Sequence, residues 1–110
     1  MKVSIQQQDF NVQAELELLR VHDSASSPGA IVTFTGLVRD FDSDAQVTSL
    51  FLEHYPGMTE KSLEEISSEA AQRWAIIDSV IIHRIGLLEA NEQIVFVGVS
   101  SKHRHDAFAA

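Results

Sequence analysis

The fold is decided by an uncharged run of nine residues, Ala30-Ile31-Val32-Thr33-Phe34-Thr35-Gly36-Leu37-Val38. β-Branched residues are frequent in this run, and the absence of charge predicts a strand that is buried on both faces. Gly36 inside the run predicts a bulge or the close approach of another backbone. A second long strand is expected over residues 47–55, after a polar loop, and it should pair antiparallel with the first.

Hydrophobic spacing predicts the elements before and after these strands. The alternation around Val3 and Ile5 predicts a short first strand, and Asn11 is expected to cap the helix that follows it. A longer helix is predicted over residues 58–74, because apolar residues recur there every three or four positions. Its expected inner face consists of Leu63, Ile66, Ala70 and Trp74.

The C-terminal part of the chain predicts two further strands, over residues 79–85 and 93–100, joined by a turn at residues 89–92. Ser101 is expected to cap a final helix that has only begun at Ala110, so we expect the chain to lack a C-terminal segment. The order β-α-β-β-α-β-β-α is typical of an α+β fold with mostly antiparallel strands and helices packed on the sheet.

Length and composition exclude several classes of function. The 110 residues are enough for one domain, spanning residues 1–110, and too few for two. Eight basic and 16 acidic residues give a net charge of −8, which argues against general binding of DNA or RNA. The absence of cysteine excludes catalytic thiols, thiolate metal sites and a persulfide on this chain. No stretch is long and apolar enough to span a membrane, and we expect a cytoplasmic protein without a membrane partner.

Cationic side chains follow one another where the final helix is expected to begin. Lys102, His103 and Arg104 stand there in a chain that is otherwise acidic. A helix N-terminus attracts anions, and an arginine can hold two phosphate oxygens at once. These residues therefore predict an anion pocket, with phosphate as the expected ligand. The alternative interpretation is a solvated basic turn.

Two further positions are candidates for binding or acid–base chemistry. Arg39 ends the uncharged strand, from where a side chain can reach a site, and its alternative role is an ion pair with a neighbouring aspartate. Glu53-His54-Tyr55 offers an acid or a base, and its alternative role is a polar strand edge before a turn. His22 and His83 have no evident partner in the sequence, and both are interpreted as structural.

No metal and no cofactor are expected. The run Asp40-Phe41-Asp42-Ser43-Asp44 imitates the start of a calcium-binding loop, but Ala45 and Phe51 stand where that loop needs glycine and glutamate. His103 and His105 are two residues apart and do not share a helix face, which argues against zinc. No glycine-rich nucleotide motif follows any expected strand.

Four motifs, in this order, resemble the large, catalytic subunit of molybdopterin synthase, the MoaE family. They are Phe34-Thr35-Gly36-Leu37-Val38-Arg39, Leu52-Glu53-His54-Tyr55-Pro56-Gly57-Met58, His83-Arg84-Ile85-Gly86 and Phe96-Val97-Gly98-Val99-Ser100-Ser101-Lys102-His103-Arg104. The resemblance extends from about Gly29 to Phe108, and the first strand and helix agree with it in order and spacing. It implies the family's α/β hammerhead fold with an additional antiparallel sheet.

The resemblance also implies an activity and partners. The family inserts sulfur into cyclic pyranopterin monophosphate and so forms the dithiolene of molybdopterin. The sulfur arrives as a thiocarboxylate on the C-terminal glycine of a small ubiquitin-like subunit. Two large subunits form a central homodimer within a heterotetramer, with a small subunit at each end. A chain without cysteine is consistent with sulfur that a partner supplies.

The resemblance assigns site residues by position. The family's substrate-binding positions correspond to Leu37, Val38, Arg39, His103 and Arg104. Phe34 would line the same pocket. Because the family's site lies near the dimer contact, some of these residues would serve the neighbouring protomer. The family's catalytic lysines lie beyond Ala110, so no catalytic residue is assigned. The alternative is a truncated, catalytically inactive module of the same family that binds its dimer and subunit partners.

Overall fold

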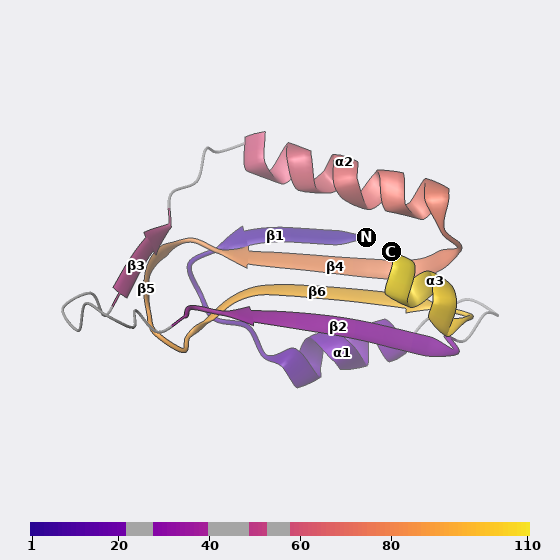
Figure 1. The fold of residues 1–110 in the computed structure, drawn as a ribbon, viewed down its shortest axis with the longest axis horizontal. Helices are drawn as coiled ribbons and strands as arrows, with labels where there is room; N and C mark the ends of the chain where they lie inside the picture. Colours follow the sequence, from indigo (N-terminus) through magenta and orange to yellow (C-terminus); the bar gives the residue numbers. More distant parts are fainter. Residues whose placement is uncertain (22–27, 40–48, 53–57) are drawn as a thin grey trace.

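The computed structural model describes residues 1–21, 28–39, 49–52 and 58–110 (Figure 1). The strands are β1 (Lys2–Gln6), β2 (Ala30–Leu37), β3 (Ser49–Leu52), β4 (Ile76–Arg84), β5 (Gly86–Glu89) and β6 (Gln93–Ser101). The helices are α1 (Val12–Arg20), α2 (Met58–Arg73) and α3 (Arg104–Ala109). They form a four-stranded sheet, a two-stranded sheet and helices that pack on the larger sheet, which confirms the predicted α+β class.

The larger sheet has the strand order β1-β4-β6-β2. β1 runs parallel to β4, and the other two pairs are antiparallel, so the sheet is mostly antiparallel as predicted. The predicted pairing of the 47–55 strand with the first long strand is wrong, because β3 pairs with β5 in the additional antiparallel sheet. The sequence pattern does not predict β5. Its course depends on Gly86, whose φ of 91° redirects the chain directly after β4.

β2 is an edge strand, which corrects the prediction that it is buried on both faces. Within the described residues it pairs only with β6, and the side chains of Phe34 and Leu37 are 61% and 48% exposed. An edge strand of this kind leaves unpaired backbone groups beside apolar side chains. The irregularity predicted at Gly36 is confirmed, since the register with β6 shifts between Gly36 and Leu37.

The core lies between α1 and one face of the larger sheet. Asn11 caps α1 as predicted, because its Oδ1 accepts a hydrogen bond from the backbone N–H of Ala14 over 2.9 Å. The buried cluster consists of Leu19, Val80, Ile82 and Phe96. Full burial of a side chain of this size contributes about 1.5–3 kcal/mol. This packing fixes β4 and β6, the strands that lead to Arg84 and Lys102.

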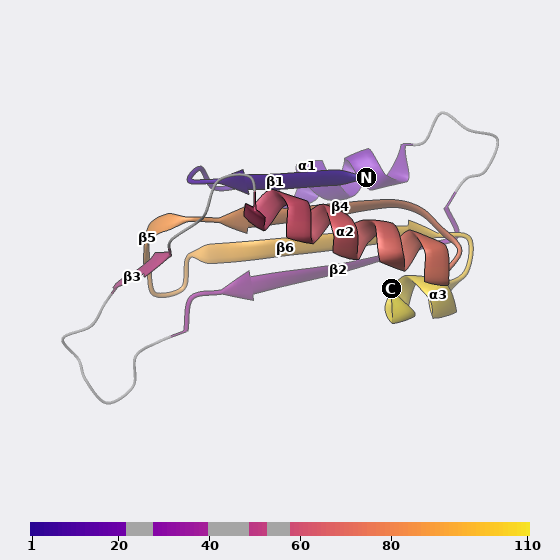
Figure 2. The ribbon, with the colours of Figure 1, turned by 90° about the horizontal axis from the view of Figure 1, so that it is seen from above.

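α2 and α3 lie on the opposite face of the sheet from α1 (Figure 2). The 58–74 helix is confirmed, but its predicted inner face is wrong at Ile66, which is 58% exposed, whereas Ser67 is buried. The reason is that α2 packs mainly over β1 and β4 and does not close over β6. An apolar groove of about 290 Å³ therefore remains between α2 and the valine side chains of β6.

His103, not Ser101, is the N-cap residue of α3, and its side chain makes no capping hydrogen bond. The correction arises because β6 continues one residue further than expected and includes Ser101 in its pairing with Ala30. The hydroxyl of Ser101 donates to the carbonyl oxygen of Ala75 over 2.8 Å and accepts from the backbone N–H of His103 over 3.3 Å. Among the described residues, no helix is both long and apolar enough to cross a bilayer.

Candidate functional site

Lys102, His103 and Arg104, called here the cationic cluster, lie between the end of β6 and the first turn of α3. All three side chains are exposed, whereas Ser101 directly before them is 0% exposed. The backbone is held at this point, because Ser101 makes the hydroxyl bonds described above and its carbonyl oxygen accepts from the N–H of Gly29 over 2.9 Å. A hydrogen-bonded backbone thus presents three exposed basic side chains to solvent.

Gly29 allows the start of β2 to lie directly against the cationic cluster. A Cβ atom at this position would overlap the carbonyl oxygen of Lys102, which is a backbone atom and cannot turn away. Any larger residue at position 29 would therefore displace the segment that carries the cluster.

Within the described part of the chain, no side chain of the cationic cluster forms a hydrogen bond or an ion pair. Elsewhere, Lys2 pairs with Glu15 at 2.9 Å and Arg20 with Glu17 at 3.1 Å. The cluster therefore keeps its donors for an anion, in a chain whose net charge is −8. Guanidinium and ammonium groups of this kind bind phosphate oxygens through charge-assisted hydrogen bonds, and an imidazole N–H can donate another hydrogen bond.

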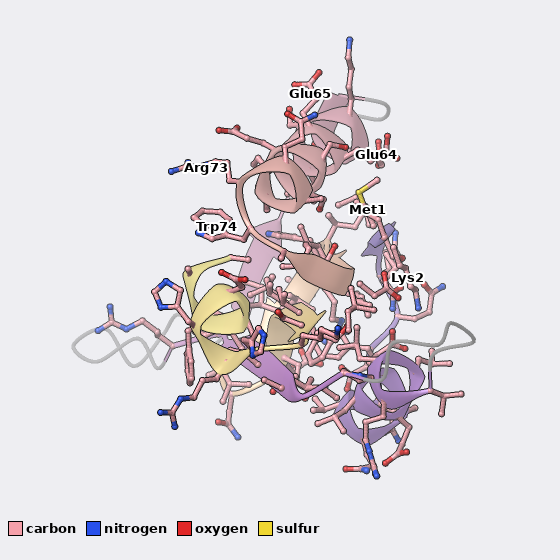
Figure 3. The ribbon with its side chains drawn as sticks, turned by 90° about the vertical axis from the view of Figure 1, so that its right-hand side faces the viewer. Met1, Lys2, Glu64, Glu65, Arg73 and Trp74 are labelled. Atoms are coloured by element: carbon pink, nitrogen blue, oxygen red, sulfur yellow. The ribbon has the colours of Figure 1, made fainter. Side chains whose placement is uncertain are left out.

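Apolar side chains border the cationic cluster. Arg104 and His105 line a shallow depression together with Phe108 and Ala109. Trp74 is the only tryptophan of the chain, and its ring lies on the same side of the molecule as α3 (yellow in Figure 3), with Arg73 4.6 Å above it. Cations beside apolar walls suit a ligand that combines an anionic group with a ring system.

Arg39 lies at the other end of β2. The start of β2 faces the end of β6 through the Ala30–Ser101 pair, whereas Arg39 follows the last residue of the strand. Arg39 lies nine positions after Ala30, and in an extended strand this separation spans about 30 Å. One copy of the chain therefore does not bring Arg39 together with His103 and Arg104, although the latter two are neighbours.

The other residues assigned by resemblance lie along β2 or at its end. Phe34 stands in the middle of the strand and projects into solvent. Leu37 is half-exposed, and Val38 is buried with 4% exposure. The N–H of Val38 donates to the carbonyl oxygen of Glu92 over 2.9 Å, and its carbonyl oxygen accepts from the N–H of Asn91 over 2.8 Å. Val38 thus anchors the strand end from which Arg39 projects.

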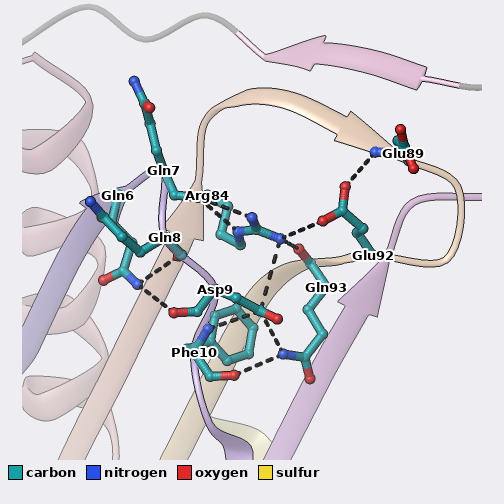
Figure 4. A network of polar contacts seen from close by, with 9 residues as sticks. All are labelled: Gln6, Gln7, Gln8, Asp9, Phe10, Arg84, Glu89, Glu92 and Gln93. Atoms are coloured by element: carbon teal, nitrogen blue, oxygen red, sulfur yellow. Dashed lines mark hydrogen bonds and ion pairs between the residues drawn. The ribbon is translucent and has the colours of Figure 1, made fainter.

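Sequence analysis missed a second arginine, Arg84, as an organising residue (Figure 4). Its side chain is 8% exposed, and Nε and Nη2 both donate to the carbonyl oxygen of Gln7, over 3.1 and 3.0 Å. Nη1 donates to the carbonyl oxygen of Gln93 over 2.9 Å. The same atom lies 3.8 Å from Asp9 Oδ1 and 3.6 Å from Glu92 Oε1. Every residue has a backbone carbonyl oxygen, so the partners of Arg84 cannot be recognised from residue types. In the sequence, Arg84 stands out only as part of the His83-Arg84-Ile85-Gly86 motif.

Asp9 completes this network from the segment after β1. Its Oδ1 accepts from the side-chain amide of Gln93 and from the backbone N–H of Phe10, each over 2.8 Å. These two hydrogen bonds, together with the guanidinium of Arg84, lower the pKa of the Asp9 carboxyl from its usual value of 3.8. In this network the charge of Arg84 is thus compensated by Asp9 and Glu92, and each nitrogen of its guanidinium donates to a backbone carbonyl oxygen.

The remaining candidates are limited by what the structure describes. His22, Asp40–Asp44 and Glu53-His54-Tyr55 lie outside the described residues. His83 places Nδ1 2.8 Å from the carbonyl oxygen of Arg84 and borders the groove beneath α2, consistent with a structural role. No group of three or more potential metal ligands occurs among residues 1–21, 28–39 and 59–110.

Comparisons with known proteins match nearly the whole chain. The family model described as MoaE protein matches residues 5–110. A molybdopterin synthase catalytic subunit from Vibrio cholerae is 52% identical over 109 residues, which make up 99% of this chain and 71% of that protein. The molybdopterin biosynthesis MoaE protein from Burkholderia ambifaria is 44% identical, with a TM-score of 0.85 over 99% of this chain and 69% of that one. A molybdopterin synthase from Staphylococcus aureus is 32% identical, with a TM-score of 0.79 over 98% of this chain and 74% of that one.

Proposed function

This chain belongs to the MoaE family, and from that membership we propose that it is the large subunit of a molybdopterin synthase that transfers sulfur to cyclic pyranopterin monophosphate. Its role lies in molybdenum cofactor biosynthesis. The sulfur donor is the thiocarboxylate at the C-terminus of a small ubiquitin-like subunit. A partner must supply the sulfur, because the chain has no cysteine that could carry it as a persulfide.

The cationic cluster is the observation that carries this proposal. The substrate is a phosphate ester of a ring system, and its phosphate needs charged donors that are not neutralised by the protein. His103 and Arg104 offer such donors directly after the end of β6, and Arg104 also lines the apolar depression. In this proposal Arg104 and His103 bind the phosphate, and the depression accommodates part of the ring system.

The substrate site is composed of two copies of the chain. Arg39 is separated from the cationic cluster within one copy, but β2 is an uncharged edge strand that can pair with a second β2. Phe34 stands five residues before Arg39 and five residues after Gly29. An antiparallel β2–β2 pair centred near Phe34 would therefore place Arg39 of one copy beside Gly29 and the cationic cluster of the other. The exposed Phe34 and Leu37 side chains would be covered by the same contact.

Substitution of Arg104 tests the phosphate site. Arg104→Ala should weaken the binding of cyclic pyranopterin monophosphate by about 1.5–3 kcal/mol, the scale of a lost charge-assisted hydrogen bond. Calorimetry measures the affinity, and the fluorescence of Trp74 gives a second readout near the site. Arg20→Ala is the matched control, because Arg20 lies on α1 and pairs with Glu17. Unchanged affinity in Arg104→Ala would reject the role of the cluster.

Mixed dimers test the composite site. Arg39→Ala and Arg104→Ala homodimers should both bind the substrate poorly. A dimer with one copy of each variant contains one site with both arginines intact and one site with neither. Mixing the two poorly binding variants should therefore restore part of the substrate binding. If the mixture binds no better than its components, while exchange of subunits is demonstrated by mass spectrometry, Arg39 and the cationic cluster do not share a site across the dimer.

Catalysis is tested separately with the thiocarboxylated small subunit. Formation of the dithiolene by this chain supports the proposed sulfur transfer. Binding of the small subunit and of the pterin without turnover would instead support a module that binds both partners and lacks the chemistry.

A further inference from the structure

We propose that Arg84 is a positioning residue that sets the direction of Arg39 in the substrate site, an inference that rests on the proposed function and adds a residue to it. Arg84 cannot itself bind the substrate. Its side chain is 8% exposed, and every nitrogen of the guanidinium already donates to a backbone carbonyl oxygen. Two carboxylates near Nη1 also compensate its charge.

Arg84 is bonded to the turn between β5 and β6. Nη1 of Arg84 bonds the carbonyl oxygen of Gln93 over 2.9 Å and lies 3.6 Å from Oε1 of Glu92. The second carboxylate oxygen of Glu92 accepts from the backbone N–H of Glu89 over 2.6 Å. Asn91 in the same turn has a φ of 71°, a conformation that needs support from its surroundings. Arg84 thus bonds to the turn from the end of β4 (Figure 4).

The turn is connected to Arg39 through the residue before it, Val38. Both peptide groups of Val38 bond to this turn, through the N–H to Glu92 and the carbonyl oxygen to Asn91. Val38 is also buried, so it cannot move independently of the turn. The next residue is Arg39. A displacement of the turn therefore changes the direction in which the Arg39 side chain leaves the strand.

The negative charge of Glu92 is also held in place by Arg84. The carbonyl oxygen of Glu92 accepts from the N–H of Val38, so the backbone of this acidic residue is bonded to the residue directly before Arg39. Arg84 and the N–H of Glu89 hold this carboxylate within the turn. Released from Arg84, the carboxylate could pair with Arg39 and compete with the substrate phosphate. Arg84 thus supports substrate binding both by geometry and by holding an acidic competitor in place.

A double-mutant cycle tests this role through the affinity for cyclic pyranopterin monophosphate, measured by calorimetry on the intact dimer. Arg84→Lys should weaken binding by about tenfold, less than the hundredfold that a misplacement of about 1 Å can cost. In an Arg39→Ala background, Arg84→Lys should cause no further loss, because its effect passes through Arg39. A general loss of folding would add to the effect of Arg39→Ala instead, and an additive result would overturn the inference.

Glu92→Gln provides a second variant in case Arg84→Lys does not fold. It keeps an acceptor for Glu89 but removes the charge next to Arg84, and it should weaken binding by about threefold, the scale of a partly exposed ion pair. This loss too should vanish in the Arg39→Ala background, and its persistence there would contradict the inference. Arg20→Lys is the control. If Arg39→Ala itself leaves the affinity unchanged, the proposed substrate site fails; if only the Arg84 and Glu92 variants have no effect, the positioning role alone fails.

Discussion

Arg84 and Arg104 lie at opposite ends of the antiparallel β4–β6 pair, and their surroundings differ in every respect that decides what an arginine can do. Arg84 is buried at the end of β4, donates to the carbonyl oxygens of Gln7 and Gln93, and has two carboxylates nearby. Arg104 is exposed at the start of α3, and its side chain has no partner among the described residues. An arginine therefore stabilises the fold at one end of the sheet, whereas at the other end an arginine has donors available for a ligand.

This difference gives a physical criterion for recognising a binding residue in an acidic chain. An acidic protein has carboxylates available to neutralise most of its cations. A group of cations that remains unpaired keeps its hydrogen-bonding capacity for a ligand, whereas a cation with satisfied donors stabilises the fold.

The largest effect on stability is expected for Arg84→Ala. Two part-buried carbonyl oxygens would lose a charged donor, each worth about 1.5–3 kcal/mol, so the free energy of unfolding should fall by about 3 kcal/mol. Arg104→Ala removes an exposed side chain and should change it by no more than about 0.5 kcal/mol. Urea denaturation of both variants measures the difference. Equal losses in the two variants would remove the distinction between a structural and a binding arginine.

Gly29→Ala is expected to have the next largest effect and to act at the other end of the sheet. The new methyl group would collide with the backbone carbonyl of Lys102, so the free energy of unfolding should fall by about 1–3 kcal/mol. The cationic cluster would be displaced, and the affinity for the pterin phosphate should fall with it.

Gly98→Ala is the matched control for this substitution. Gly98 lies within β6, and the nearest neighbours of a methyl group there would be the side chains of Leu19 and Phe96, which belong to the core and not to the cationic cluster. It should reduce stability and leave the affinity unchanged. Equal loss of affinity in both variants would show that binding follows global stability and not the position of the cluster.

The comparison of the two ends also shows which features can be predicted from sequence. The helices and most strands were predicted because their signals are local, such as the Asn11 cap and the recurrence of apolar residues over residues 58–74. The cationic cluster was found for the same reason, since its members are consecutive. Arg84 was missed because its carbonyl partner on Gln7 is 77 residues away, and a backbone oxygen leaves no signature in the residue types.

The position of β2 at the edge was not predictable from its composition. An uncharged strand is expected in the middle of a sheet, but it is equally suited to an edge that a second copy covers. Only the strand order of the sheet distinguishes a central position of β2 from an edge position. The same long-range information decides the pairing of β3 with β5, a strand of four residues whose course depends on the positive φ of Gly86.

The smallest predicted effect is a pH dependence that belongs to the Arg84 end of the sheet. The pKa of Asp9 is lowered by its hydrogen bonds to Gln93 and Phe10 and by Arg84, so the folded state favours the ionised carboxylate. This contribution to stability is fully present above the usual pKa of 3.8 and is lost as the pH falls through the lowered value. Its size is small, because the Asp9 side chain is 62% exposed and solvent screens the interaction.

Asp9→Asn isolates this contribution, since asparagine keeps the acceptor and removes the charge. The variant should be less stable than the parent chain at neutral pH, and the difference should shrink at an acidic pH below the lowered pKa of the parent carboxyl, where that carboxyl is uncharged as well. Urea denaturation at both pH values measures the difference, with Glu64→Gln on the exposed side of α2 as the control. A difference that stays constant with pH would mean that the Asp9 hydrogen bonds, and not its charge, connect the segment after β1 to Arg84. Affinity for the pterin phosphate at neutral pH should change less in Asp9→Asn than in Glu92→Gln, because only Glu92 also bonds the strand end that carries Arg39.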